Sequence, residues 1–247
     1  MSTKAIILAA GSSRRLRPIT DNRPKCLVEL NGETILDYQL RCLEKCQVKE
    51  ILIVAGYKKE MIREHLKKSK HNQLIKVICN DIFDKTDNTY SLSLALQEID
   101  EKKDSVIVLD GDIIFDVRLL RNVLITNYKN VLIADNIGKM EAEDNKVLIK
   151  RGYVKCISKK IKGTAIYNSI IKLNGRFLKE FKDECKKIEN RTEWYTNSLT
   201  RVLQSFPKAM KVIFTQGLSA CEIDNKEDLI QAIKIYDKIK EINEIIP

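Results

Sequence analysis

Apolar residues in the first half of the chain form short runs that alternate with segments of helical periodicity. The runs that predict buried strands are Lys4–Ala9, Glu50–Ala55, Ile75–Cys79 and Ser105–Leu109. The segments between them, with apolar residues three or four apart, are Ile35–Glu44, Lys59–Lys68 and Thr89–Ile99. Strands separated by helices of this length indicate right-handed βαβ units. We therefore expect a three-layer, Rossmann-like α/β fold, with a mainly parallel sheet flanked by helices.

The pattern changes after about Phe115. Alternation over Asn145–Ile161 predicts a hairpin that turns near Arg151 and Gly152. The other elements expected here are strands at Val131–Asp135, Gly163–Tyr167 and Lys211–Thr215 and helices at Gly175–Lys187, Thr192–Leu203 and Asn225–Ile242. Because the chain contains no linker, repeat or low-complexity tract, we predict one domain over 1–247. Its core is 1–115, and its second half, 116–247, carries an inserted hairpin and helix lid and a closing helix.

Composition and charge narrow the function classes. The chain has 247 residues and a net charge of +10, but its lysines are interleaved with acids. We therefore expect no nucleic-acid role, and positive charge also suits an enzyme with anionic substrates. No apolar run approaches the roughly 20 residues that span a bilayer, so no membrane role is expected. The run Ala5–Ala10 is too short for a signal peptide, and seven cysteines without a Cys-x-x-Cys pair indicate reduced thiols and a cytoplasmic location.

The first strand leads into a loop of small residues and arginines. Its sequence is Leu8-Ala9-Ala10-Gly11-Ser12-Ser13-Arg14-Arg15-Leu16-Arg17. Ligands bind at the carboxyl ends of strands in open α/β sheets, small residues admit anions to the backbone N–H groups, and arginines grip phosphate oxygens. Lys25, after Pro24, adds a second basic point. A basic, solvated loop is the alternative, and neither Gly-x-x-x-x-Gly-Lys-Ser/Thr nor Gly-x-Gly-x-x-Gly occurs in the chain.

Two acidic segments suit a hard cation. Asp110 and Asp112 flank a glycine where the fourth strand ends, and carboxylates with substrate phosphates are the usual ligands of Mg²⁺. The same Asp-Gly-Asp sequence is also good turn chemistry. Asp224 lies just before the closing helix. Either Asp224 or Asn225 alternatively caps that helix.

The segment Leu8 to Leu16, followed by Pro24 and Lys25, resembles the signature of the sugar-phosphate nucleotidyltransferase superfamily. The resemblance implies a nucleotide-diphospho-sugar transferase-like fold with 1–115 as the nucleotide-binding core and 116–247 as the acceptor-binding half. It implies nucleotide contacts from Leu8, Ala10, Gly11, Ser12, Ser13, Arg14 and Asp110, catalytic Arg15 and Lys25, and Mg²⁺ on Asp112 and Asp224. The family's second glycine is Ser13 here. Either Ser13 takes a positive φ or the loop is reshaped.

A polar segment narrows the resemblance. The sequence Asn88-Thr89-Tyr90-Ser91-Leu92 resembles the branch that contains bacterial phosphocholine, 2-aminoethylphosphonate and inositol-phosphate cytidylyltransferases. Asn88 and Ser91, with Asn80, are then candidates to bind the base or ribose. An ordinary helix start is the alternative.

The second half offers groups for an acceptor. Glu193, Trp194 and Tyr195 suit a cationic amine, although Trp194 alternatively anchors the core. Lys146 and Lys159 suit the acceptor's phosphate, or are surface lysines of the hairpin.

These observations predict a cytidylyltransferase. CTP and a phosphorylated or phosphonate acceptor, with phosphocholine or 2-aminoethylphosphonate foremost, give a CDP-linked product and pyrophosphate. An anionic acceptor needs no histidine or serine nucleophile, and we interpret both histidines as surface residues. The alternatives are a sugar-1-phosphate uridylyl-, thymidylyl- or guanylyltransferase, an inositol-phosphate cytidylyltransferase and, less favoured, a non-catalytic nucleotide-binding subunit. A homodimer is left open.

Overall fold

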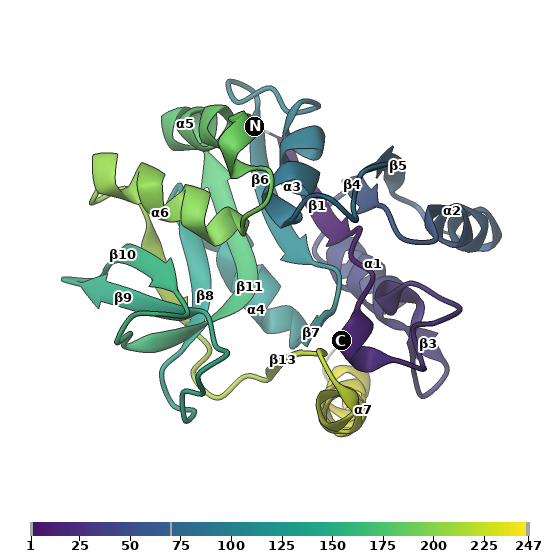
Figure 1. The fold of residues 1–247 in the computed structure, drawn as a ribbon. Coiled ribbons are helices and arrows are strands. Elements are labelled where there is room, and N and C mark those ends of the chain that lie inside the picture. The colour runs from purple at the N-terminus through teal and green to yellow at the C-terminus, as the bar shows by residue number, and fades with distance from the viewer. Residues whose placement is uncertain (1, 70, 246–247) are drawn as a thin grey trace.

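A nine-stranded sheet runs through the middle of the protein (Figure 1). The computed structural model describes residues 2–69 and 71–245. Along the sheet the strands follow the order β5-β4-β1-β6-β11-β8-β12-β10-β9. The first four are β5 (Leu74–Cys79), β4 (Glu50–Ala55), β1 (Ser2–Ala9) and β6 (Asp104–Asp110), and these four strands run parallel to one another. The parallel strands expected in the first half are thus confirmed.

Helices cover both faces of this sheet. The helices on one face are α1 (Ile35–Lys45), α2 (Lys59–Lys68), α4 (Val117–Ile125) and α7 (Lys226–Ile245), and those on the other are α3 (Asn88–Leu96), α5 (Gly175–Cys185) and α6 (Tyr195–Ser205). Successive side chains of β1 point to opposite faces. Ala5 and Ile7 therefore pack in the apolar core on the side of α1, and Ile6 packs in the apolar core on the side of α3. The three expected layers are confirmed.

The second half of the sheet departs from the mainly parallel arrangement expected for the sheet as a whole. Its strands are β8 (Val131–Asp135), β9 (Lys146–Lys150), β10 (Tyr153–Ser158), β11 (Ala165–Asn174) and β12 (Lys211–Phe214). Strand β11 runs antiparallel to both β6 and β8, and β9 pairs with β10 and also with β11. The five strands therefore close into a ring. Alternation of apolar residues carries no information on strand direction, which explains the difference.

The hairpin turns where it was expected. Arg151 has a φ of 53° and Gly152 a φ of 72°. However, β9 and β10 belong to the main sheet and are not a separate flap inserted beside it. Strand β11 was expected over only five residues because Asn168 and Ser169 interrupt its apolar pattern. Ser169 indeed leaves the strand conformation, with a φ of 53°, where the pairing with β8 shifts register.

The remaining elements are short. They are β2 (Glu29–Leu30), β3 (Glu33–Thr34), β7 (Ile113–Phe115), β13 (Ala220–Glu222) and the 3-10 helices η1 (Arg14–Leu16), η2 (Lys25–Leu27) and η3 (Ile188–Asn190). Strand β13 pairs with β7, just after β6 ends. In Figure 1, α7 (yellow) follows β13 and lies beside the early part of the chain (purple), where Asn31 donates a hydrogen bond to Asp237.

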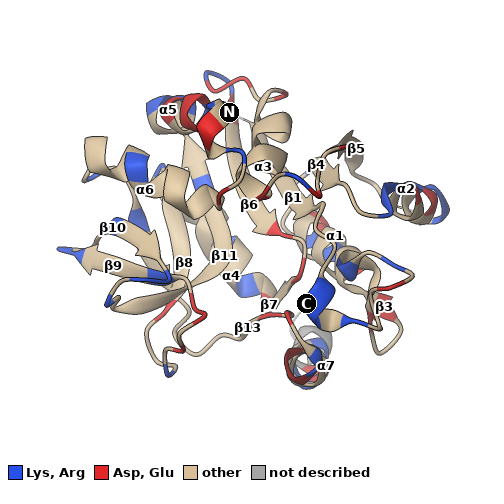
Figure 2. Cartoon of the chain, in the orientation of Figure 1, with Lys and Arg blue, Asp and Glu red and all other residues tan. Residues whose placement is uncertain are grey.

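Charged residues are spread over many elements of the fold. Figure 2 shows lysines and arginines on helices and loops on both sides of the molecule, with acids between them. Acidic residues also lie inward, where β6 ends and beside β13. Within the described ranges, no helix combines the length and apolar character that a membrane crossing requires.

Candidate active site

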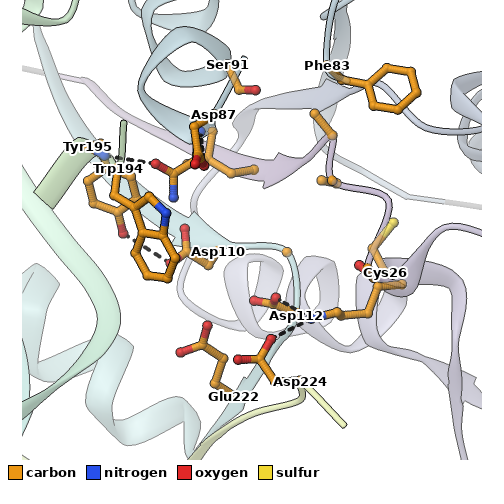
Figure 3. A pocket seen from close by; sticks show the side chains of 18 of the residues that line it. Cys26, Phe83, Asp87, Ser91, Asp110, Asp112, Trp194, Tyr195, Glu222 and Asp224 are labelled. Atoms are coloured by element: carbon orange, nitrogen blue, oxygen red, sulfur yellow. Dashed lines mark hydrogen bonds and ion pairs between the residues drawn. The ribbon is translucent and has the colours of Figure 1, made fainter. Parts of the chain in front are cut away.

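A cavity of about 290 Å³ opens at the carboxyl ends of β1 and β6 (Figure 3). Ligands bind at this edge in open α/β sheets. The predicted site residues that line the cavity are Leu8, Ala10, Gly11, Ser13, Arg15, Lys25, Asn88, Ser91, Asp110, Asp112, Trp194, Tyr195 and Asp224. Those outside its lining are Ser12, Arg14, Asn80, Lys146, Lys159 and Glu193. Lining residues that the sequence analysis did not single out include Phe83, Asp87, Asn145, Tyr167, Thr196 and Glu222.

The loop after β1 keeps a left-handed residue where the superfamily has glycine. Ser13 has φ 48° and ψ 51°, so the first of the two alternatives for this position holds. A non-glycine residue in this conformation costs roughly 1–2 kcal/mol. The carbonyl of Ser13 accepts hydrogen bonds from the Thr20 hydroxyl at 2.9 Å and from the Leu16 backbone N–H at 3.2 Å, which fix the turn. The space beside Gly11 is open, since an added Cβ would meet no atom within 4 Å.

Lys25 joins acids from two distant parts of the chain. Its side chain is almost buried, and its Nζ lies 2.8 Å from Asp112 Oδ2 and 3.0 Å from Asp224 Oδ1. Burial disfavours the ammonium charge, but the two carboxylates outweigh it and raise the pKa of Lys25. Arg15 reaches the other oxygen of Asp224 at 2.8 Å. Although burial opposes its ionisation, Lys25 and then Arg15 hold the pKa of Asp224 below its usual range.

Three carboxylates converge beside Lys25. One oxygen each from Asp112, Glu222 and Asp224 lies within 4.8 Å of the others, and Figure 3 shows the three side chains together. Asp112 Oδ1 is buried and has no hydrogen-bond partner within 2–69 and 71–245. Crowding of the Glu222 carboxyl by surrounding protein atoms, followed by the charges of Asp112 and Asp110, raises the pKa of Glu222 well above its usual range. Oxygen ligands with excess negative charge suit Mg²⁺, so these residues fit the predicted metal.

Glu222 was missed by the sequence analysis, although a signal was present. Glu222 and Asp224 flank the fully buried Ile223 at the end of β13. Side chains two apart on an extended backbone share one side, so Glu222 and Asp224 lie together. The Glu-Ile-Asp alternation was therefore sufficient to propose Glu222 with Asp224.

The cap of α7 is separate from this cluster. Asn225 Oδ1 accepts from the Asp228 backbone N–H at 2.9 Å, and Asp228 Oδ2 accepts from the backbone N–H groups of Asp224 at 2.9 Å and Asn225 at 3.1 Å. The side chains of Asn225 and Asp228 thus cap the helix. The carboxylate of Asp224 contacts Lys25 and Arg15 instead.

Asp110 is held inside the protein. Tyr195 donates its hydroxyl to Asp110 Oδ2 at 3.2 Å, and Gln39 donates Nε2 to the Asp110 carbonyl at 2.9 Å. Burial, and then the charge of Asp112, raises the pKa of Asp110 to about 7. The residue between the two aspartates must be glycine, since a Cβ on Gly111 would lie 2.6 Å from the Leu8 carbonyl oxygen.

The polar candidates around α3 have different environments. Asn80 is buried behind the cavity wall and donates Nδ2 to the hydroxyl oxygens of Ser91 and Thr86, each at 3.0 Å. Asn88 faces the cavity, and its Oδ1 accepts the Tyr195 backbone N–H at 2.8 Å. Asp87 caps α3 by accepting from the Asn88 N–H at 2.7 Å. Ser91 and Asn88 are therefore positioned to contact a ligand, and Asn80 holds Ser91.

The acceptor-side candidates divide in the same way. Trp194 is half-buried and lines the cavity, so it is not a core anchor. Lys159 lies outside the lining, with its Nζ 4.0 Å from the centre of the Trp194 ring. Glu193 forms an ion pair with Arg201. The Lys146 ammonium donates to the backbone carbonyls of Ala142 and Lys159, at 3.2 and 3.1 Å.

Two known proteins are similar in sequence to this chain. The chain is 37% identical to a choline-phosphate cytidylyltransferase of Streptococcus pneumoniae over 121 residues, which is 49% of each protein. It is 28% identical to a CTP:phosphoglutamine cytidylyltransferase of Campylobacter jejuni over 250 residues, covering 91% of this chain and 97% of that one. The matched region therefore spans about half of the pneumococcal relative and nearly all of the other.

Solved structures share the fold over almost the whole chain. The inositol-1-phosphate CTP transferase from T. maritima superposes with a TM-score of 0.81 at 20% identity, covering 96% of both chains. The CTP:phosphocholine cytidylyltransferase of Streptococcus pneumoniae superposes with a TM-score of 0.73 at 25% identity, covering 96% of this chain and 100% of that one. The fold is thus nucleotide-diphospho-sugar transferase-like, as the resemblance implied. Residues 5–158 match the MobA-like NTP transferase domain, and the chain belongs to that family.

Proposed function

We propose that this protein is a cytidylyltransferase that transfers the cytidylyl group of CTP to a phosphorylated small molecule and releases pyrophosphate. The observation that carries this proposal is the contact of Lys25 with Asp112 and Asp224 beside the loop at Gly11. It unites a phosphate loop, a buried cation and an acid cluster in one cavity. The relatives that act on choline phosphate and on phosphoglutamine support CTP as the nucleotide.

The reaction needs positive charge more than it needs a nucleophilic side chain. An oxygen of the acceptor's phosphate attacks the α-phosphorus of CTP, and the bond to the bridging oxygen of the β-phosphoryl group breaks as pyrophosphate leaves. Arg15 and Lys25 neutralise charge that builds up on the phosphoryl oxygens, and the loop at Gly11 orients the triphosphate. The histidines take no part in this scheme. His65 and His71 lie against Asp37 instead, with His65 Nε2 2.9 Å from its carboxylate.

Asp112 and Asp224, with Glu222, are the residues that would hold Mg²⁺. The bound ion supplies Lewis-acid polarisation of the phosphoryl oxygens and neutralises part of their charge. Lys25 keeps Asp112 and Asp224 together, because its ammonium contacts both carboxylates. Asp112 Oδ1, which has no hydrogen-bond partner in the described part of the chain, remains available as a ligand.

The second half of the chain, 116–247, supplies the acceptor side of the cavity, where Trp194 and Tyr195 line it. Phosphocholine and 2-aminoethylphosphonate are the leading acceptors, because the face of Trp194 already attracts a cation, the ammonium of Lys159. A cationic acceptor takes this place at the cavity, and the displaced Lys159 then contacts the acceptor's phosphate. Glu193 acts indirectly, through its ion pair with Arg201.

The test is a screen for pyrophosphate release with Mg²⁺. The four nucleoside triphosphates are each combined with phosphocholine, 2-aminoethylphosphonate, inositol 1-phosphate and a hexose 1-phosphate. We expect release with CTP and an acceptor that carries an amine. Preference for UTP, dTTP or GTP with a hexose 1-phosphate would overturn the cytidylyl assignment, and preference for inositol 1-phosphate would overturn the amine acceptor alone.

A further inference from the structure

Residues 191–195, here called the strap, run along the first turn of α3. The backbone N–H of Asp87 donates to the Arg191 carbonyl at 2.7 Å, and that of Thr89 donates to the Glu193 carbonyl at 3.3 Å. The side-chain oxygen of Asn88 accepts the Tyr195 backbone N–H at 2.8 Å. The strap and α3 are about one hundred residues apart in sequence. These three bonds fix the start of α6 against the nucleotide-facing end of α3.

Tyr195 extends this connection to the end of β6. Its side chain is 1% exposed, and its hydroxyl lies 3.2 Å from Asp110 Oδ2 and 2.9 Å from the hydroxyl of the buried Tyr167. A phenol has one proton to donate, and the Tyr195 hydroxyl gives its proton to Asp110 Oδ2. The Tyr167 hydroxyl therefore donates to Tyr195, and Tyr195 donates to Asp110. Figure 3 shows Tyr195 pointing at Asp110, which lies between Tyr195 and the carboxylates of Asp112, Glu222 and Asp224.

We propose that Tyr195 is a positioning residue that fixes the carboxylate of Asp110, and through it the geometry of the Asp110–Asp112 segment that holds the metal. This proposal rests on the function proposed above. The segment has little freedom of its own, because Gly111 donates its backbone N–H to the Leu8 carbonyl at 2.9 Å. The direction of the Asp110 side chain is then set by its hydrogen bonds with the hydroxyls of Tyr195 and Ser169. The strap contains Trp194, on the proposed acceptor side, and the backbone N–H of its Tyr195 bonds to Asn88 in the first half of the chain. The strap therefore joins Tyr195 to both sides of the cavity.

The first test is Tyr195→Phe, which keeps the ring and removes the hydroxyl. Loss of the hydrogen bond to Asp110 should weaken binding of Mn²⁺ in the presence of CTP roughly tenfold. It should also raise the Mg²⁺ concentration for half-maximal turnover by a similar factor. The matched control is Tyr167→Phe, which leaves the bond from Tyr195 to Asp110 in place and should change metal affinity much less. Metal binding is measured by the electron paramagnetic resonance of free Mn²⁺, and folding by the melting temperature.

A double-mutant cycle decides whether Tyr195 acts through Asp110. In the Asp110→Ala background, Tyr195→Phe should cause little further loss of metal affinity, because the acceptor that the Tyr195 hydroxyl positions is gone. An undiminished tenfold loss in that background would overturn the proposal. So would wild-type metal affinity in Tyr195→Phe, whether or not its melting temperature falls. The metal titration needs no acceptor, so it still tests Tyr195 if the wild type releases no pyrophosphate with CTP, an outcome that would overturn only the proposed function.

Discussion

The positively charged side chain of Lys25 is almost buried. Its two carboxylate partners are 87 and 199 residues away in the sequence. Replacing it by alanine removes the charge and leaves Asp112 and Asp224 to repel each other. We expect Lys25→Ala to lower the turnover number by roughly 10²–10³, the usual cost of one preorganised charge. The measurement is steady-state pyrophosphate release at saturating CTP, with the melting temperature as the check on folding. A turnover number near that of the wild type would rule out a catalytic Lys25.

Asp224 and Asp228 offer a matched pair of substitutions. Asp224→Asn weakens a metal ligand, so it should raise the Mg²⁺ concentration needed for activity, and EDTA should abolish activity in both mutant and wild type. Asp228→Asn disturbs the cap of α7 and should cost about 1 kcal/mol in stability with a normal response to metal. Metal titrations and thermal unfolding of both variants separate these effects. The opposite pattern would return Asp224 to the role of helix cap.

At the level of single residues, most of the cavity was predictable and its limits were not. The small and basic residues after β1, together with Asp110, Asp112 and Asp224, share a composition that phosphate and metal chemistry requires, and all of these lining residues were identified. The partner of each polar side chain is a matter of tertiary distance. The sequence therefore did not indicate that Arg201 forms an ion pair with Glu193, or that the ammonium of Lys159 lies over the ring of Trp194.

Among the elements, the pairing of β1 with β6 depends on Gly111. A Cβ at this position would lie 2.6 Å from the Leu8 carbonyl oxygen and 3.1 Å from the Ala9 Cβ, so the loop after β6 would have to move away from β1. We expect Gly111→Ala to destabilise the protein by roughly 1–3 kcal/mol and to reduce metal affinity as Asp112 shifts. Chemical denaturation measures the first effect.

Gly138→Ala is the matched control for this substitution. Its added Cβ would meet only the side-chain oxygen of Asp135, at 3.3 Å, which can move. Its stability should stay within about 0.5 kcal/mol of the wild type. Equal stability losses in the Gly111 and Gly138 variants would show that the close approach at Leu8 is not what requires glycine.

The elements themselves were predicted unevenly, for a physical reason. Helices cover both faces of the parallel half of the sheet. Its strands, β1, β4, β5 and β6, therefore appear in the sequence as nearly continuous apolar runs. Strand β11 contains Ser169 in a left-handed conformation and extends to Asn174, and its antiparallel partners are set by contacts that local periodicity does not encode. The helices, with caps such as Thr34 and Asp87, were found within a few residues of their ends, except α4, which was missed.

On the scale of the whole molecule, residues from both halves of the chain line the cavity, and the proposed acceptor side, at Trp194, belongs to the second half. Trp194→Leu alters only the acceptor side, so it should weaken use of phosphocholine or 2-aminoethylphosphonate by roughly 30-fold, since a desolvated cation over tryptophan gains about 2 kcal/mol. The affinity for CTP should change little. The measurement is kcat/KM for the acceptor beside the Kd of CTP. Equal losses for both substrates would place Trp194 outside acceptor recognition.

The antiparallel pairing of β13 with β7 joins parts of the chain that are synthesised at different times. A ribosome makes the phosphate loop and Lys25 about 200 residues before Glu222 and Asp224. Residues 5–158, which match the family domain, are complete well before those two acids exist. A growing chain therefore contains the anion-binding loop long before it contains the full acid cluster. A nonsense or frameshift mutation anywhere upstream of residue 222 consequently removes the same two carboxylates.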